Sequence, residues 1–302
     1  MQSFKELFDL TEKIERQNLV LAGAEDFEAV KAVATAEKKG LIKPFFVGKK
    51  EHILENIQNL EGKKTLKEYE IIDTENDSET AEKSVKLISN GEGTLLMKGL
   101  IKTAVLLKAV LNKDWGLRTG RLLSHIAVAE TQTLKKIIAI TDGGMNLRPD
   151  INEKRDIILN AVELMKSLGI KTPRVAPVAA VEVVNEKMPE TTDAAILSKM
   201  NDRGQIKGCV VDGPLGLDNA LSDFAAGVKK ISGDVAGNAD IILVPDIHSG
   251  NLLGKSVEYI GGGTIAGLLM GAAVPIVIVS RADRAEAKLT SIALGTINTA
   301  RR

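Results

Sequence analysis

Short apolar runs rich in valine and isoleucine recur along the chain, and segments with helical spacing lie between them. Residues 241–244 read IILV and residues 275–279 read PIVIV, each bounded by turn residues. A short run that is apolar at every position is typical of a parallel strand buried on both faces. Because such runs alternate with helices, the sequence predicts βαβ units and an α/β fold.

The same patterns predict the individual elements. The expected strands are residues 19–22, 44–47, 69–73, 94–97, 127–130, 136–141, 174–178, 209–212, 241–244 and 275–279. The expected helices are residues 3–16, 27–39, 49–59, 77–89, a helix containing Thr103 and Lys108, and residues 151–168, 191–200, 217–225, 261–271 and 285–297. The helix at 261–271 is rich in glycine, which suits close packing against a sheet or a neighbouring subunit.

At 302 residues the chain is too long for one ordinary core, so two α/β lobes are expected. The loop TDGGMNLRPD, residues 141–150, leads into the second lobe. The last strand and helix would close the first lobe. We therefore predict a first lobe from residues 1–141 and 275–302, and an inserted second lobe from residues 142–274. Each lobe would be a three-layer αβα sandwich, with a cleft between the two.

Composition excludes several classes of function. The 40 Lys and Arg balance the 40 Asp and Glu, so no net positive field attracts nucleic acid. No apolar run approaches the ~20 residues that span a membrane. The N-terminus reads as a polar amphipathic helix rather than a signal peptide, which predicts a cytoplasmic protein. The single cysteine, Cys209, lies in an apolar run and is expected to be buried and structural.

Polar groups follow the apolar runs at residues 241–244 and 275–279. Residues 246–251 (DIHSGN) follow the first run, and Ser280 and Arg281 follow the second. Ligands of open α/β sheets collect beyond the carboxyl ends of strands, and arginine offers a planar two-pronged donor to an oxyanion such as phosphate. The alternative is structural: Ser280 would cap the helix that starts near Arg284, and Arg281 would pair with Glu286.

A second basic segment, GLRTGRLLSH, carries Arg118, Arg121 and Ser124 amid glycines. It is either a second anion site or a solvated basic loop. The three histidines are scattered and no Cys/His or EF-hand spacing occurs, so no metal is expected; we interpret His125 as structural and His248 as a turn residue. The chain lacks a Walker A motif and a G-x-S-x-G elbow. GGG at 261–263 has no preceding strand and is weak support for NAD.

Several segments together carry a resemblance to a known family. PDIHSGN with Lys255, a following glycine pair, and a strand that ends in SRAD resemble the phosphate acetyltransferase and phosphate butyryltransferase family. LMKGLIKT, GLRTGRLLSH, VAAVEVVN, DAAILSKMNDRGQIKGCVVDGPL and SRADRAEAKLTSIAL resemble its butyryltransferase branch. The resemblance covers nearly the whole chain.

The resemblance implies a fold like that of the isocitrate and isopropylmalate dehydrogenases, a homodimer or higher homo-oligomer, and the reaction acyl-CoA + phosphate = acyl phosphate + CoA. Coenzyme A and phosphate are then substrates, and no bound cofactor is implied. Ser280 would hydrogen-bond the developing oxyanion, and Arg281 would hold phosphate. Further phosphate or CoA contacts would come from the matching segments: Thr103, Lys108, Arg118, Arg121 (favoured as the second family arginine), Ser249, Asn251, Lys255 and Asp283.

One position departs from the family pattern. The acetyl branch carries an aspartate in the last helix, thought to deprotonate the CoA thiol, and the aligned residue here is Ala287. We assign the base to the neighbouring Glu286. Asp283 is the alternative, and thiol deprotonation without a dedicated carboxylate is a third possibility.

Three rival functions remain open. One is the acetyl enzyme of the same family. Another is an NAD-dependent dehydrogenase on the related fold, and the last is a protein that binds CoA without catalysis. The rate on acetyl-CoA relative to butyryl-CoA discriminates the first from the favoured butyryl enzyme, because extra methylenes shift pocket preference by about 1–3 kcal/mol.

Overall fold

The computed structural model describes residues 1–61, 69–279 and 283–302, and the chain divides into two compact units. The terminal unit comprises Lys5–Arg121 and Ala266–Arg302; the central unit comprises Leu122–Ile265 together with Met1–Phe4. The domain boundaries predicted from the sequence fall after residues 141 and 274. Residues 122–141 were predicted in the first lobe but lie in the central unit. Residues 266–274 were predicted in the second lobe but lie in the terminal unit.

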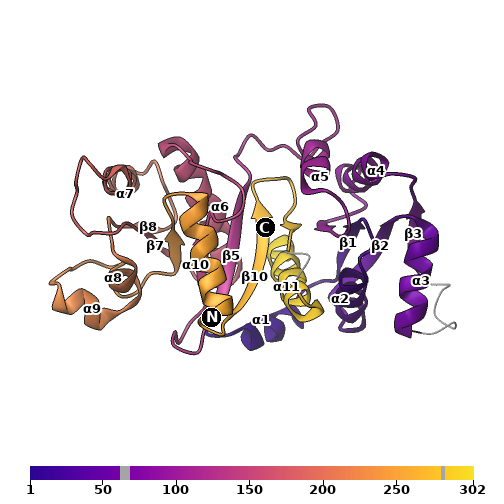
Figure 1. Ribbon diagram of the computed structural model, residues 1–302, viewed down its shortest axis with the longest axis horizontal. Helices are drawn as coiled ribbons and strands as arrows, with labels where there is room; N and C mark the ends of the chain where they lie inside the picture. Colours follow the sequence, from indigo (N-terminus) through magenta and orange to yellow (C-terminus); the bar gives the residue numbers. More distant parts are fainter. Residues whose placement is uncertain (62–68, 280–282) are drawn as a thin grey trace. The chain divides into compact units, whose positions relative to one another are not determined.

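The terminal unit is built on strands in the order β3-β2-β1-β4-β11-β10 (Figure 1). All neighbouring strands in this order are parallel except β10, which runs antiparallel to β11. The strands are β1 Gln17–Ala22, β2 Ile42–Gly48, β3 Glu70–Asp73, β4 Leu95–Lys98, β10 Thr264–Met270 and β11 Ile276–Val277. The helices are α1 Phe4–Thr11, α2 Phe27–Lys38, α3 Lys50–Glu61, α4 Asp77–Ser89, α5 Thr103–Val110 and α11 Ala285–Arg301. The elements α1 and β10 begin in the central unit, at the boundaries.

The central strands of this unit end at a common edge. In the parallel register Ala22 lies opposite Lys98, and Met97 lies opposite Val277. The turns that follow β1 and β4 touch backbone to backbone, because a Cβ on Gly99 would stand 2.1 Å from the carbonyl oxygen of Gly23. The carboxyl ends of β1, β4 and β11 are therefore held side by side, and ligands of open α/β sheets collect at such an edge.

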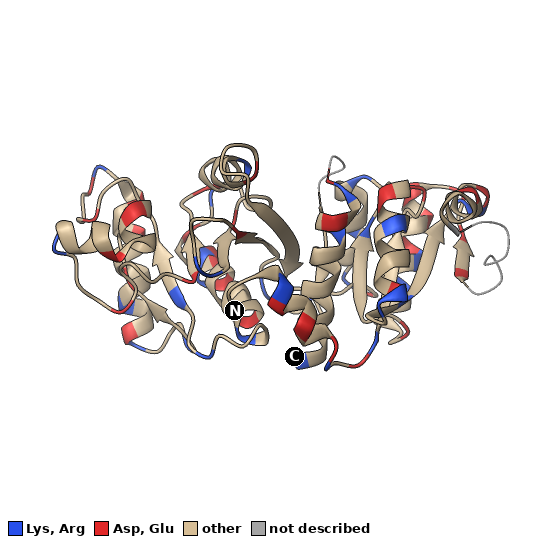
Figure 2. Ribbon diagram, turned by 90° about the horizontal axis from the view of Figure 1, so that it is seen from below, with Lys and Arg blue, Asp and Glu red and all other residues tan. Residues whose placement is uncertain are grey.

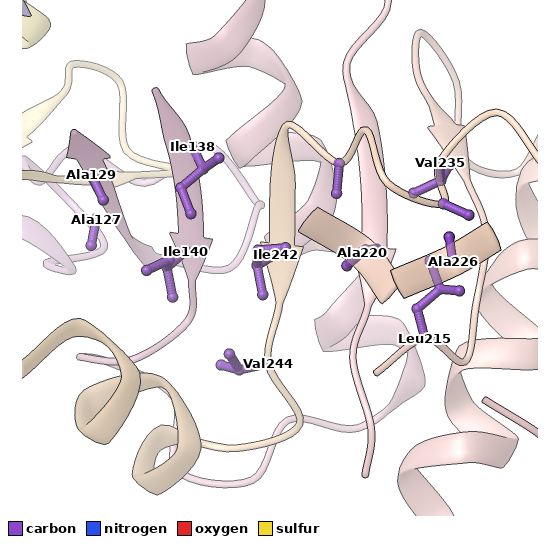
Figure 3. Close-up of a cluster of buried hydrophobic side chains, with 13 residues drawn as sticks. Ala127, Ala129, Ile138, Ile140, Leu215, Ala220, Ala226, Val235, Ile242 and Val244 are labelled. Carbon is purple, nitrogen blue, oxygen red and sulfur yellow. The ribbon is translucent and has the colours of Figure 1, made fainter. Parts of the chain in front are cut away.

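The central unit has the strand order β5-β6-β9-β7-β8, with β5 and β6 antiparallel and the others parallel. Figure 3 shows its core, in which Ile140 of β6 lies beside Ile242 of β9 in the same register. The strands are β5 Ser124–Glu130, β6 Ile138–Thr141, β7 Arg174–Pro177, β8 Val210–Val211 and β9 Ile241–Leu243. The helices are α6 Ile151–Ser167, α7 Pro189–Asp202, α8 Leu217–Leu221, α9 Asp223–Val228 and α10 Ile247–Tyr259.

Two predicted elements were wrong. Residues 261–271 do not form a helix: most of the segment is β10, which is buried from residue 266 to residue 270 and pairs with β11. The DIHSGN segment is not a turn but the start of α10, with Asp246 as its N-cap. Gly250 in α10 admits the close approach of Gly143, whose Cα would lie 2.5 Å from a Cβ at that position. Position 250 therefore requires glycine because of this close packing and not because of a turn.

Both kinds of charge are interspersed over the helices and loops of each unit (Figure 2). Among residues 1–61, 69–279 and 283–302, no helix combines the length and the apolarity that crossing a bilayer needs. Cys209 is buried, and burial raises the pKa of its thiol to about 11, while Lys166 acts in the opposite direction. The prediction that Cys209 is buried is confirmed.

Candidate active site

The terminal unit contributes the segment that follows β11. Ser280 and Arg281 lie outside the described residues. The first described residue after them is Asp283, which is half-buried. Helix α11 begins at Ala285, so Glu286 lies in its first turn with its side chain exposed. A carboxylate in the first turn of a helix is favoured by the helix dipole.

Thr103 and Lys108 lie on α5, which follows the carboxyl end of β4. Thr103 is the first residue of the helix, and its N-cap, Lys102, makes no side-chain capping bond. Lys108 lies in the last turn, and both Thr103 and Lys108 are exposed. Thr103 is therefore close to the carboxyl edge of the sheet, while Lys108 lies about one and a half turns further along the helix.

The loop with Arg118 and Arg121 packs at the other end of β11. The backbone of Arg118 forms an isolated antiparallel β-bridge with Ala272. The hydroxyl of Thr119 donates to the carbonyl of Gly271 at 2.5 Å. Residues 271 and 272 belong to the turn between β10 and β11, so Arg118 lies by the amino end of β11 and Asp283 beyond its carboxyl end. Both arginine side chains are exposed.

The predicted contacts of the central unit all lie on α10. The N–H and the hydroxyl of Ser249 both donate to the carboxylate of Asp246, each at 2.8 Å, and these bonds hold the pKa of Asp246 below its usual value. Asn251 and Lys255 are exposed and four residues apart, on one helix face. Lys255 pairs with Glu258 at 3.3 Å and lies over the ring of Tyr259. The hydroxyl of Ser249 is thus bound to the N-cap residue, Asp246, whereas Asn251 is accessible.

His125 is the second residue of β5 and is half-buried, between the buried residues Ser124 and Ile126. Burial lowers the pKa of its imidazole, although Asp142 opposes the shift. The Asp142 carboxylate accepts bonds from the N–H groups of Gly144 and Met145, at 2.9 and 3.0 Å, and orders the loop after β6. A neutral, packed histidine agrees with the structural interpretation of His125.

Two buried lysines of the terminal unit were assigned no role from the sequence. Lys98, the last residue of β4, is 7% exposed, and Lys288, in the second turn of α11, is 1% exposed. Both lie within segments that carried the family resemblance, LMKG and SRADRAEAK. Their burial could have been suspected from the sequence, because each lysine occupies a position where the pattern of the strand or helix calls for an apolar residue.

Comparison with known proteins decides the family. The model of the family described as "Phosphate acetyl/butaryl transferase" matches residues 78–296. The chain belongs to this family. It is an enzyme of that type, as the resemblance predicted.

Individual members of the phosphate acetyl/butyryl transferase family match over most of their length. The chain is 44% identical over 297 residues to the phosphate butyryltransferase of Clostridium acetobutylicum, which covers 98% of both chains. It is 43% identical over 272 residues to the phosphate acetyltransferase of Rickettsia felis, covering 90% of this chain and 77% of the other. A crystal structure of a branched-chain phosphotransacylase from Enterococcus faecalis V583 superposes with a TM-score of 0.83 at 30% identity, covering 95% of this chain and all of that one.

Proposed function

We propose that the protein transfers a short-chain acyl group, preferably butyryl, between coenzyme A and inorganic phosphate. The observation that carries the proposal is the match to a phosphate butyryltransferase over 98% of both chains. Identity alone does not separate the branches, because the acetyltransferase relative is 43% identical. Coverage does not separate them either, because another acetyltransferase relative, 42% identical, is covered over 95% of its length. The preference for butyryl rests on the matching segments of the sequence together with the slightly higher identity to the butyryltransferase, 44%.

The reaction requires few chemical parts. A phosphate oxygen attacks the carbonyl carbon of the thioester, and the carbonyl oxygen becomes an oxyanion. The C–S bond then breaks and releases the CoA thiolate, which takes up a proton. Fixed phosphate, a hydrogen-bond donor for the oxyanion and a stabilised thiolate supply the catalysis. Ser280 is proposed as the oxyanion donor and Arg281 as the phosphate ligand.

Glu286 is the proposed acid/base group at the sulfur, and the exposure of its side chain in the first turn of α11 supports this role. Thr103 is proposed to contact phosphate or CoA from the start of α5, because it follows the carboxyl end of β4. Lys108, Arg118, Arg121, Ser249, Asn251, Lys255 and Asp283 remain proposed contacts as the sequence analysis gave them. Among these residues, Ser249 has the least support as a ligand contact, because its hydroxyl already bonds the N-cap residue Asp246.

A two-lobe arrangement with an intervening cleft, like that of the isocitrate and isopropylmalate dehydrogenases, is part of the proposal. So are a homo-oligomeric state and a cytoplasmic location. The dehydrogenase alternative loses its one motif, because the glycines at 261–263 connect a helix, α10, to a strand, β10. The dinucleotide fingerprint runs in the opposite order, from strand to helix.

A panel of acyl-CoA substrates with two to five acyl carbons tests the function. Free CoA, detected with a thiol reagent, should appear only when phosphate is present, and fastest with butyryl-CoA. A higher kcat/KM on acetyl-CoA would assign the acetyl activity instead. Absence of release from every member of the panel would refute acyl transfer, and binding of CoA in that case would identify a non-catalytic binder.

A further inference from the structure

Helix α10 carries apolar side chains over more of its surface than the sheet of the central unit covers. On the inner side, Leu253 and Val257 are half-buried and pack against the core of this unit (Figure 1). Of the 13 residues of α10, only Gly250 is buried. Leu252 and Tyr259 are 68% and 71% exposed. A second face of the helix is therefore apolar and exposed.

The exposed side chains form one stripe along the helix. Leu252, Ser256, Tyr259 and Ile260 have the i, i+4, i+7, i+8 spacing that places residues on a single helix face. Ile260, the C-cap residue, is 85% exposed. We call these four residues the outer stripe.

The two apolar faces of α10 adjoin one another. At about 100° per residue, the apolar side chains from Tyr259 round to Val257 span roughly 160° of the helix surface. A helix that covers one sheet needs an apolar stripe a little over ~100° wide, and an apolar surface that extends further is typical of a helix buried on more than one side. The outer stripe therefore has the character of a contact surface.

The charges beside the outer stripe identify what covers it. Lys255 and Glu258 pair at 3.3 Å and are 47% and 33% exposed. If two copies of α10 pack antiparallel across a two-fold axis at Ser256, residues before the axis in one copy face residues after it in the other. Lys255 of each copy then lies near Glu258 of the other, and Leu252 lies against Ile260. Such a surface is complementary to itself in charge and in apolar contact, as a two-fold interface requires.

We propose that the outer stripe of α10 binds a second copy of the chain, with the two helices antiparallel about a two-fold axis at Ser256. This inference rests on the homo-oligomeric state that is part of the proposed function, and it gives that state a location. It also assigns Lys255 to the contact between copies instead of to CoA.

Charged substitutions in the outer stripe test the contact. In Leu252→Asp and Tyr259→Asp the mass in solution, measured by light scattering coupled to size-exclusion chromatography, should fall to half of the wild-type mass or less. The circular dichroism of both variants should match the wild type, because neither side chain is buried in the single chain. Phe224→Asp is the matched control. Phe224 is 82% exposed on α9 of the same unit, and this variant should keep the wild-type mass.

A disulfide tests the position of the axis. A residue on a two-fold axis faces its own copy, so Ser256→Cys, made together with Cys209→Ala, should join two chains on mild oxidation with copper phenanthroline. A non-reducing gel should then show a band at twice the 32.3 kDa of the chain. Ser232→Cys in the same background is the control: Ser232 is exposed in the central unit but lies outside the stripe, and the chain should stay single.

Exchanging the charges tests the antiparallel register. Lys255→Glu brings like charges together across the axis and should raise the dissociation constant of the oligomer about 10-fold. Adding Glu258→Lys to the same chain restores the complementary pattern and should recover the wild-type value. A double variant that is weaker than Lys255→Glu alone would contradict the register.

The outcomes separate the interface from the oligomer and from the chemistry. Wild-type protein at 32.3 kDa over the whole concentration range refutes the oligomer and, with it, this inference. A wild-type oligomer whose mass is unchanged in Leu252→Asp and Tyr259→Asp, and which Ser256→Cys does not cross-link, overturns the inference alone and assigns the stripe to another occupant. If the charged variants do not fold, the cross-link through Ser256→Cys decides. Absence of acyl transfer would refute the proposed activity but would alter none of these masses.

Discussion

The proposed phosphate site depends mainly on one guanidinium. Arg281 can offer two parallel N–H donors to an oxyanion, whereas a lysine such as Lys108 offers a point charge. Lys108 is exposed on the last turn of α5, where water screens its field. Most of the binding energy for phosphate is therefore expected from Arg281.

Replacing Arg281 by alanine should weaken transition-state stabilisation by about 2–4 kcal/mol, because a charge-assisted contact to the attacking phosphate is lost. Steady-state kinetics with phosphate as the varied substrate measure the effect. Arg203→Ala, at the exposed end of α7, is the control and should behave as the wild type. Unchanged kinetics in Arg281→Ala would refute its assigned role.

Glu286→Gln tests the assignment of the base. If Glu286 exchanges the thiol proton, kcat should fall about 100-fold. Asp283→Asn is the comparison, and its effect should be smaller. Wild-type rates in Glu286→Gln would show that the thiolate forms without this carboxylate, and a larger effect in Asp283→Asn would move the role to that residue.

Cys209 gives a prediction for pH dependence. Burial raises the pKa of its thiol from 9.0 to about 11, so the folded state favours the protonated form. This contribution to stability is complete below pH 9 and is lost as the pH rises from 9 toward 11, because the unfolded chain ionises first. The native protein should resist a thiol reagent at pH 8 and react after unfolding, with Cys209→Ala as the unreactive control. Fast labelling of the native protein would contradict the burial.

At the scale of elements, α6 and α7 are joined by a buried ion pair. The ammonium of Lys154 lies 2.6 Å from the carboxylate of Asp193, and their side chains are 7% and 30% exposed. The sequence analysis placed Asp193 in the first turn of a helix but did not identify its partner. The contact depends on the packing of two helices that are distant in sequence, which no local pattern reveals.

Asp193→Asn should destabilise the protein by about 3 kcal/mol, because the buried ammonium of Lys154 loses its counter-charge. The free energy of unfolding in urea measures this. On the same helix, Lys199 and Asp202 pair at 2.6 Å but are 67% and 59% exposed. Asp202→Asn is therefore the matched control, with an expected cost below about 1 kcal/mol. Equal costs in the two variants would contradict the difference in burial.

Elements with strong local signals were found from sequence, and elements set by distant partners were not. The helix predicted at 151–168 corresponds to α6, whose start carries a capping box of Asp150 and Glu153. In contrast, β10 was predicted as a helix because its glycines and apolar residues fit tight helix packing. Its extended form is stabilised by pairing with β11, where Leu269 lies opposite Ile276.

At the scale of the whole molecule, the resemblance to the family leads to a prediction about assembly. The proposed homo-oligomer should have a mass in solution of at least twice the 32.3 kDa of the chain, about 65 kDa. Light scattering coupled to size-exclusion chromatography measures it, across a range of protein concentrations. A single species at the mass of one chain would refute the oligomer without affecting the proposed chemistry.

The sequence by itself determined the α/β class, the buried state of Cys209 and the family, because apolar runs, helical spacing and matching segments are local properties of the chain. Only the tertiary structure decided that residues 264–270 form a strand, that Gly250 packs against Gly143, and that Lys154 of α6 pairs with Asp193 of α7. Each of these depends on partners that are distant in sequence and are brought together by folding. The hydrogen-bonding and packing energies of such contacts exceed weak local preferences such as that of glycine against a strand.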